Sequence, residues 1–216
     1  MRTLRFLIGL AGAVVVPPAL LAQTVADSGT FVIRHAGDTV ATERFARTST
    51  HLEGTLALHN SRSTSQRYSA VVAPDATLPL IEVTVREDAD SGRVKDRLVQ
   101  RARVIFKEDS AAVDAVTGQG LETRIFGTEK GAVPYLNLSF ALLEQAVRRS
   151  RAGTGSSAVS FFNLGGGQTV SGIVTSISAD SLALAIGGVE YRLRVDGEGR
   201  VLGGGIPAQG VEVERQ

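Results

Sequence analysis

Apolar and polar residues alternate along most of the chain after residue 29, in short segments separated by glycine, proline and other turn residues. In segment 80–86, for example, Ile81, Val83 and Val85 alternate with polar neighbours. Successive side chains of a β-strand point to opposite faces, so this pattern predicts strands with one buried face. The predicted strands are 30–36, 39–48, 52–58, 66–73, 80–86, 97–107, 111–116 (with a short helix as the alternative), 121–126, 158–163, 168–177, 181–186, 189–195, 200–205 and 211–215.

Short turn signals join many of these strands. Gly37-Asp38, Gly187-Gly188 and the segment 196–199 each have the composition of a tight hairpin, because glycine adopts positive φ without steric cost. Short strands joined in this way are typical of an antiparallel meander, sandwich or barrel.

One segment, 137–151, follows the helical period instead. Its apolar residues cover more than half of a helical wheel, so we expect a largely buried helix. Asn137 is placed to cap the first turn, and Gly153 suits a left-handed exit after the last turn. Most of the predicted elements are strands, so we predict a mainly β fold. A sheet with one apolar face and an apolar helix bury their apolar surfaces by packing against each other. We therefore expect a strongly curved antiparallel sheet that holds the 137–151 helix against its concave face.

Residues 1–22 have the pattern of a secretory signal peptide. Arg2 and Arg5 precede an apolar run over 6–16, and Ala22 offers a small residue at the cleavage point. The run is shorter than the roughly 20 residues of a membrane span, although an uncleaved anchor is the alternative. We therefore expect an exported protein, periplasmic or extracellular, whose single β-rich domain spans residues 23–216.

Composition narrows the classes of function. The chain has 23 basic and 22 acidic residues, and removal of Arg2 and Arg5 leaves 21 against 22. This balance lacks the basic excess of nucleic-acid-binding proteins. The absence of cysteine excludes disulfides, thiolate metal sites and thiol catalysis. His35, His51 and His59 form no metal-binding pattern, so we expect ordinary surface histidines, no metal and no cofactor.

No catalytic motif is present. The chain has no G-x-S-x-G sequence, and the glycines of 153–158 follow a helix and enter a strand, the reverse of the dinucleotide-binding order. Segment 165–167 lacks the Lys-Ser/Thr of a phosphate loop and predicts a turn or bulge. Asp196 and Glu198 are too few oxygen ligands for calcium by themselves. A paired-carboxylate glycosidase stays open because nothing selects a pair, but we expect a non-catalytic protein.

Alternation places a basic stripe on one face of the 97–107 strand. The stripe consists of Arg97, Arg101, Arg103 and Lys107, and it has two interpretations. The first is cross-strand pairing with acids such as Glu82 or Glu122. The second is peripheral contact with the anionic headgroups of a membrane. The opposite face of the strand is predicted to be apolar, with Leu98, Ala102, Val104 and Phe106.

The order of these elements resembles the half-closed barrel of the LolA/LolB lipoprotein-carrier superfamily. The residues that carry the resemblance are 29–33, the Gly37 hairpin leading into 40–45, the helix start at 137–143, and the closing segments 194–202 and 206–210. The resemblance covers most of the region after residue 22. It implies a half-barrel whose concave face holds an acyl chain, or whose concavity is plugged by the helix.

Two functions follow as hypotheses. The first is a non-catalytic binder or carrier of an apolar ligand, a lipid or a lipoprotein acyl chain, with the helix as plug or lid. The residues expected to line that site are Phe31, Ile33, Phe45, Phe106, Phe140 and Leu143. The alternative is a cell-envelope scaffold or interaction protein with a fully packed core and no ligand. The pattern specifies no oligomeric state.

Overall fold

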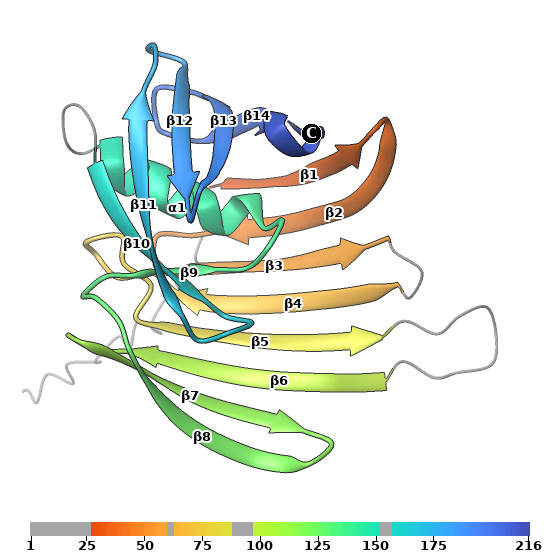
Figure 1. Ribbon diagram of the computed structural model, residues 1–216, viewed down its shortest axis with the longest axis vertical. Helices are drawn as coiled ribbons and strands as arrows, with labels where there is room; N and C mark the ends of the chain where they lie inside the picture. The colour runs from red at the N-terminus through yellow and green to blue at the C-terminus, as the bar shows by residue number, and fades with distance from the viewer. Residues whose placement is uncertain (1–26, 60–62, 88–96, 152–156) are drawn as a thin grey trace, which may run out of the picture.

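A single curved β-sheet wraps around one helix in the computed structural model, which describes residues 27–59, 63–87, 97–151 and 157–216 (Figure 1). The expected signal peptide at 1–22 and Gly153 lie outside the described residues. The predicted fold class, a strongly curved antiparallel sheet with one buried helix, is confirmed.

The described residues contain fifteen strands, an α-helix and a short 3-10 helix. Most predicted strands are present with ends shifted by one or two residues, and 111–116 is a strand, not a helix. Val133–Tyr135 was not predicted, because three residues carry too little alternation. The elements are β1 (Asp27–His35), β2 (Asp38–Arg47), β3 (His51–Leu58), β4 (Thr64–Val71), β5 (Leu80–Glu87), β6 (Arg97–Phe106), β7 (Ser110–Thr117), β8 (Gly120–Gly127), β9 (Val133–Tyr135), α1 (Phe140–Arg151), β10 (Ser157–Asn163), β11 (Thr169–Ser176), β12 (Ser181–Ile186), β13 (Val189–Val195), β14 (Val201–Ile206), the 3-10 helix η1 (Pro207–Gln209) and β15 (Val211–Arg215).

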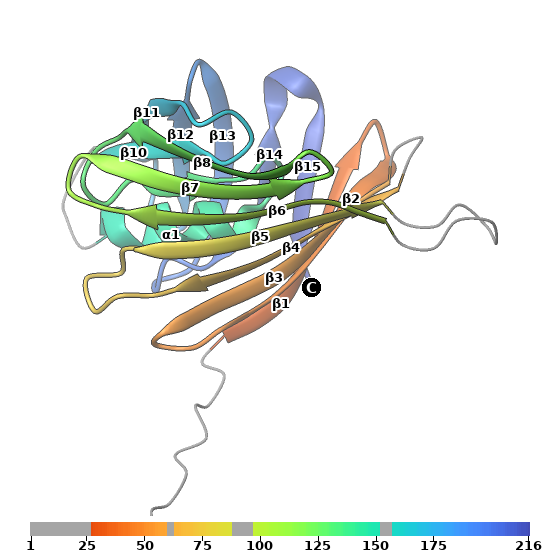
Figure 2. The same cartoon turned by 90° about the horizontal axis from the view of Figure 1, so that it is seen from below.

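The sheet consists of two runs of neighbouring strands that meet where β1 pairs with β15. Its order is β8-β7-β6-β5-β4-β3-β2-β1-β15-β14-β13-β12-β11-β10-β9, and every pair is antiparallel except β9 with β10. The first strand therefore pairs with the last, from Phe31 opposite Arg215 to His35 opposite Val211. Strands β1–β8 form one wall, β9–β14 lie across it, and α1 is enclosed between the two (Figures 1 and 2).

Tight hairpins set the register of this sheet. Gly187 and Gly188, with φ of 54° and 88°, join β12 to β13 as expected. The turn between β1 and β2 uses Ala36 and Gly37, with φ of 52° and 90°, so the predicted Gly37-Asp38 turn is one residue too late. Asp38 instead pairs with His35. Ala36 thus occupies a left-handed conformation that favours glycine.

Helix α1 is buried over its first two turns. Every residue from Ser139 to Val147 is buried, as the wheel predicted. The predicted cap is wrong, since the helix begins at Phe140 and the Oγ of Ser139 accepts the N–H of Leu142 at 3.4 Å. Asn137 instead accepts a hydrogen bond from the Tyr135 hydroxyl at 3.3 Å. Among the described residues, no helix is long and apolar enough to cross a membrane.

Candidate functional site

The N-terminus of α1 is held by a buried carboxylate from the sheet. The Oε2 atom of Glu43 accepts the backbone N–H groups of Phe140 at 2.7 Å and Ala141 at 3.0 Å. Its Oε1 atom accepts the hydroxyls of Ser139 at 2.5 Å and Tyr68 at 2.7 Å. A negative group at this position satisfies helix N–H groups that have no partner within the helix. Glu43 therefore fixes the helix start against β2 and β4.

Burial also shifts the pKa values of Glu43 and Tyr68. Glu43 is 0% exposed, and desolvation raises the pKa of its carboxyl although four donors oppose that shift. Desolvation, together with the nearby Glu43 charge, raises the pKa of Tyr68 well above its ordinary value. The Tyr68 ring reaches Glu43 by crossing Gly54, where an added Cβ would stand 2.2 Å from the Tyr68 hydroxyl. Glycine at position 54 thus makes room for this contact.

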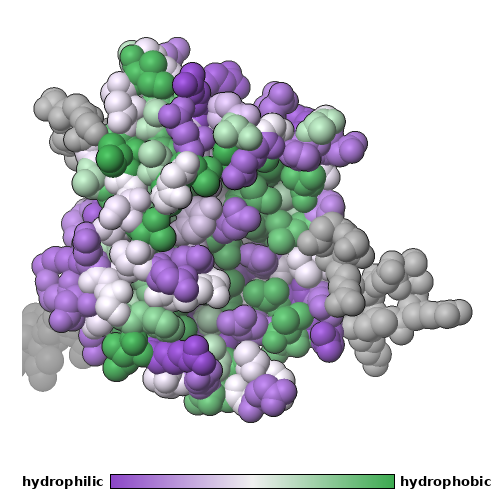
Figure 3. Space-filling view, in the orientation of Figure 1, coloured by the Kyte–Doolittle hydropathy of each residue, from purple (hydrophilic) through white to green (hydrophobic). Residues whose placement is uncertain are grey.

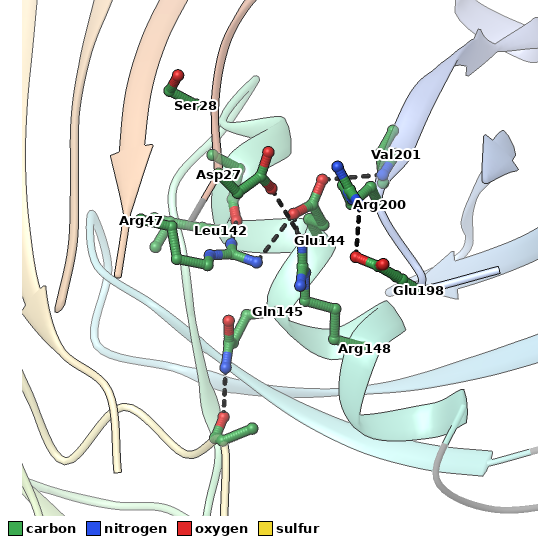
Figure 4. Close-up of polar contacts among 12 residues, drawn as sticks. Asp27, Ser28, Arg47, Leu142, Glu144, Gln145, Arg148, Glu198, Arg200 and Val201 are labelled. Atoms are coloured by element: carbon green, nitrogen blue, oxygen red, sulfur yellow. Dashed lines mark hydrogen bonds and ion pairs between the residues drawn. The ribbon is translucent and has the colours of Figure 1, made fainter. Parts of the chain in front are cut away.

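A second buried carboxylate, Glu144, connects the helix to strands on both sides of the β1–β15 pairing (Figure 4). Its Oε1 accepts from Arg47 at 2.8 Å and Arg148 at 3.0 Å, and its Oε2 accepts the Val201 N–H at 2.8 Å and Arg215 at 3.2 Å. Asp27 accepts from Arg148 and Arg215 as well. We call Asp27, Arg47, Glu144, Arg148 and Arg215 the central ion cluster.

Both carboxylates of the central ion cluster are engaged by arginines, although the Nε atom of Arg47 is buried without a hydrogen-bond partner. Three guanidinium groups meet two carboxylates, and the Arg215 guanidinium also lies 5.0 Å from the centre of the Phe45 ring. Desolvation lowers the pKa of Arg47, and the charge of Glu144 opposes this shift. Because each carboxylate is already engaged by arginines, the cluster is suited to hold strands and helix together.

The open part of the concavity lies beside the helix, over strands β4–β8. A hollow of about 260 Å³ has apolar walls from β5, β6 and the segments flanking β9 and β10. It continues into a second hollow of about 180 Å³ toward β7 and β8, and the two share Gln100, Leu164 and Gly165. We call the two together the concave groove. The first hollow is lined by Gln66, Val83, Val85, Gln100, Ala102, Leu136, Leu164 and Gly165.

The groove has an apolar floor and polar ends. Figure 3 shows hydrophobic side chains gathered in the recess over this part of the sheet. At one end the Oε1 atom of Gln66 is buried and has no hydrogen-bond partner. At the other end Glu122 and Arg124 pair with each other at 2.7 Å. Such an arrangement suits an amphipathic ligand better than a fully apolar one.

The predicted glycine turn at 165–167 forms one wall of the groove. It links β10 to β11, and Gly167 has a φ of 72°. An added Cβ at Gly167 would stand 2.4 Å from the Phe126 ring of β8. Glycine here lets the turn approach the opposite wall of the half-barrel closely.

Most of the side chains expected to line an apolar site are packed against one another. Phe31, Ile33 and Phe140 are 0% exposed, and Leu143 and Phe45 are almost as deeply buried. The ring centre of Phe31 lies 5.4 Å from that of Phe45 and 5.9 Å from that of Phe140. These residues fill the half of the concavity that α1 occupies, next to the central ion cluster.

Phe106 lies apart from this packed group. It meets Phe162 edge-on at 5.5 Å and, with Lys107, lines a separate hollow of about 290 Å³ near Pro79 and Lys130. This hollow is thus lined both by Phe106, which was expected at the apolar site, and by Lys107, which was expected at a headgroup contact.

The expected basic stripe is interrupted by a β-bulge. Val85 lies opposite Gln100 but Arg86 lies opposite Leu98, so β6 contains one extra residue there. The alternation reverses beyond the bulge, which leaves Leu98 49% exposed and puts Arg97 opposite Glu87, with an ion pair at 3.0 Å. Arg97 is therefore not on the face of Arg101 and Arg103.

Two residues of the stripe pair across strands. Arg101 and Arg103 form ion pairs with Glu82 at 3.2 Å and 3.9 Å. These contacts agree with the first interpretation of the stripe, cross-strand pairing with acidic residues. Glu122, the other acid considered, pairs with Arg124.

None of the three histidines is among the residues that line the groove. His51 and His59 lie at the two ends of β3 and contact Ser69 at 3.1 Å and Thr42 at 3.3 Å. No group of histidine and acidic side chains in the described part of the chain is placed to hold a metal ion.

Comparisons with known proteins show the fold. No protein-family model matches the chain, and no curated protein matches it. A DUF1089 family protein from Pseudomonas aeruginosa is similar with a TM-score of 0.54 and 12% identity, over 76% of this chain and 89% of that one. A β-barrel-like protein of domain of unknown function DUF1849 from Brucella abortus has a TM-score of 0.54 and 11% identity, over 88% and 96%. The chain thus has a β-barrel-like fold.

Proposed function

We propose that this protein binds, without catalysis, a lipid or a lipoprotein acyl chain in the concave groove. The observation that carries the proposal is the hollow of about 260 Å³ beside the packed helix, walled by Val83, Val85, Ala102, Leu136 and Leu164. Burial of apolar ligand surface against such walls contributes roughly 25 cal/mol per Å² removed from water. In this proposal α1 plugs one half of the concavity, and the ligand occupies the other half.

The dimensions of the groove favour a single chain. The two hollows, of about 260 and 180 Å³, are each smaller than the roughly 300–1,000 Å³ of typical ligand sites. The unpartnered Oε1 of Gln66 accepts a hydrogen bond from a ligand hydroxyl or amide, and it is costly to leave buried and unpaired. A single-chain amphiphile with a hydrogen-bond donor in its polar part meets both requirements.

The test combines identification of bound lipid with binding measurements on a variant whose groove is filled by a larger side chain. Organic extracts of the purified protein are analysed by mass spectrometry, and a fluorescent fatty acid is titrated into the delipidated protein. The variant Ala102→Phe places a ring in the groove and is expected to weaken fatty-acid binding roughly tenfold or more. The matched control is Ala57→Phe, because Ala57 lies on β3 outside the groove lining. Absence of bound lipid together with absence of fatty-acid uptake would refute the proposal.

We also propose export to the periplasm, on the basis of residues 1–22. N-terminal sequencing of the protein recovered from the periplasm is expected to begin at Gln23. That cut leaves Asp27, which anchors the central ion cluster, within the mature chain. A chain that retains its first 22 residues in the membrane fraction would instead support the anchor alternative.

The second candidate function is a cell-envelope scaffold without a ligand. Close packing of the Phe31, Phe45 and Phe140 rings favours it, because these side chains fill the half of the concavity that α1 occupies. It predicts that Ala102→Phe and Ala57→Phe behave alike in binding assays, and that a periplasmic partner is recovered by crosslinking.

A further inference from the structure

Strand β8 ends the sheet and has a free outer side. It pairs with β7 alone, and no other strand of the described residues hydrogen-bonds to it. Its sequence, GLETRIFG, contains neither lysine nor proline, the residues that commonly protect an edge strand. An edge of this kind is a template for pairing with another strand.

The register fixes which backbone groups face outward. The two-residue turn after Thr117 requires Thr117 and Gly120 to be a hydrogen-bonded pair, and at the far end the Thr128 N–H donates to the Asp109 carbonyl at 3.0 Å. Even-numbered residues of β8 therefore bond to β7. Odd-numbered residues direct their N–H and C=O groups outward; accordingly, the Gly127 carbonyl accepts from the Thr169 hydroxyl at 3.2 Å.

Leu121, Thr123 and Ile125 thus carry the free backbone groups of this edge. The sequence around Thr123 is complementary to itself when reversed. Placing Thr123 opposite Thr123 of an antiparallel copy sets Glu122 opposite Arg124 and Leu121 opposite Ile125. Shifting the two-fold axis to Glu122 or Arg124 would instead set like charges opposite each other, which is destabilising. It would also centre the pairing on backbone groups already bonded to β7.

The side chains add an apolar contact to this pairing. Leu121 and Ile125 are 69% and 76% exposed and, two positions either side of Thr123, share one face of the sheet. Val116, opposite Leu121 on β7, extends this surface and is 41% exposed. Pairing with a second copy would join two such patches across the two-fold axis and remove them from water.

We propose that the outer edge of β8 pairs with β8 of a second copy of this chain, antiparallel and two-fold symmetric about Thr123. Three residues of each copy exchange about six backbone hydrogen bonds. The Glu122–Arg124 pair within each chain is replaced by two equivalent pairs between chains. An interface of two strands is small, so the dimer is expected to dissociate at about micromolar concentration.

Charge reversal tests the register. Glu122→Arg gives a chain with two arginines around Thr123, and Arg124→Glu gives one with two glutamates. Each variant alone is expected to dimerise roughly tenfold or more weakly than the wild type, because both symmetry-related contacts become repulsive. An equimolar mixture of the two restores opposite charges at both contacts and is expected to form a heterodimer. Sedimentation velocity on protein made from the full-length coding sequence measures all of these.

Control variants make the outcome unambiguous. Glu190→Arg breaks a similar exposed pair, Glu190 with Arg192 at 2.8 Å on the interior strand β13, and is expected to leave dimerisation unchanged. Thr123→Pro removes a central N–H that β7 does not use and is expected to give a monomer that keeps its circular dichroism spectrum. A wild-type monomer at every concentration would overturn the proposal. So would a dimer insensitive to Thr123→Pro, or a variant mixture that stays monomeric.

Discussion

Glu43 offers a quantitative test of how the helix is held in the half-barrel. Its carboxylate accepts two helix N–H groups and the hydroxyls of Ser139 and Tyr68, all buried. Glu43→Ala removes the N-terminal cap, which costs about 1–2 kcal/mol, and leaves a buried hydroxyl unpaired, which costs about 1–3 kcal/mol. We therefore expect the free energy of unfolding to fall by about 2–5 kcal/mol, a large part of a typical domain stability.

Glu43→Gln separates hydrogen bonding from charge. The glutamine oxygen can still accept from Phe140 and Ala141, and the hydroxyls of Ser139 and Tyr68 can turn to accept from its NH₂ group. Glu43→Gln therefore keeps most of the hydrogen bonds, and the desolvation that raises the pKa of Glu43 offsets the benefit of a charge at the helix N-terminus, so we expect a decrease of no more than about 1 kcal/mol. Urea unfolding measures both variants, with the exposed Glu53→Ala on the adjacent strand as control. Equal losses for Glu43→Ala and Glu43→Gln would refute the reasoning.

Three further predictions concern stability. Burial raises the pKa of Glu43 above 4.5 in the folded state, so the stability that Glu43 contributes is greatest below pH 4.5 and is lost as the pH rises through the raised pKa. In urea unfolding at a series of pH values, the stability of the wild type relative to Glu43→Gln is therefore expected to decrease as the pH rises. An increase would contradict this prediction. Glu144→Leu leaves the buried Arg47 guanidinium without its carboxylate and is expected to cost about 3–5 kcal/mol in urea unfolding, whereas a loss under about 1 kcal/mol would argue against the central ion cluster as a support. Ala36→Gly relieves a left-handed alanine and is expected to add about 0.5–1 kcal/mol, seen as a higher melting temperature; a decrease would contradict the φ assigned to this turn.

The strands and helix were predictable because they depend on local periodicity. Alternation located nearly every strand, and the helical wheel of 137–151 correctly indicated a buried helix. The β-bulge near Val85 was not predictable in this way, because one extra residue reverses the alternation without a change in composition. Arg97 was consequently placed on the wrong face.

The buried charges depend on contacts between distant parts of the chain. Glu43 lies on the same face of β2 as Ala41 and Phe45, and this alternation indicates that it points inward. Its hydrogen-bond partner Ser139, however, is 96 residues away in the sequence. Ser139 rather than Asn137 became the cap because the Glu43 carboxylate sets where the first helical N–H groups must lie. Side-chain alternation alone does not contain that information.

The location of the groove also depends on long-range packing. Alternation predicted an apolar inner face, but which half of it the helix fills is decided by the contacts of α1 with β2, β9, β10, β11 and β14. Phe31 and Phe140 are packed as a result, while Val83 and Ala102 line the groove.

Photocrosslinking tests lipid binding in the concave groove most directly. A fatty acid with a diazirine on its chain is bound to the protein, irradiated, and the modified peptides are mapped by mass spectrometry. The proposal predicts modification at Val83, Val85, Ala102 and Leu164, and loss of that modification in Ala102→Phe. Modification confined to other surfaces, or none above the level of an irradiated control without the diazirine group, would contradict it.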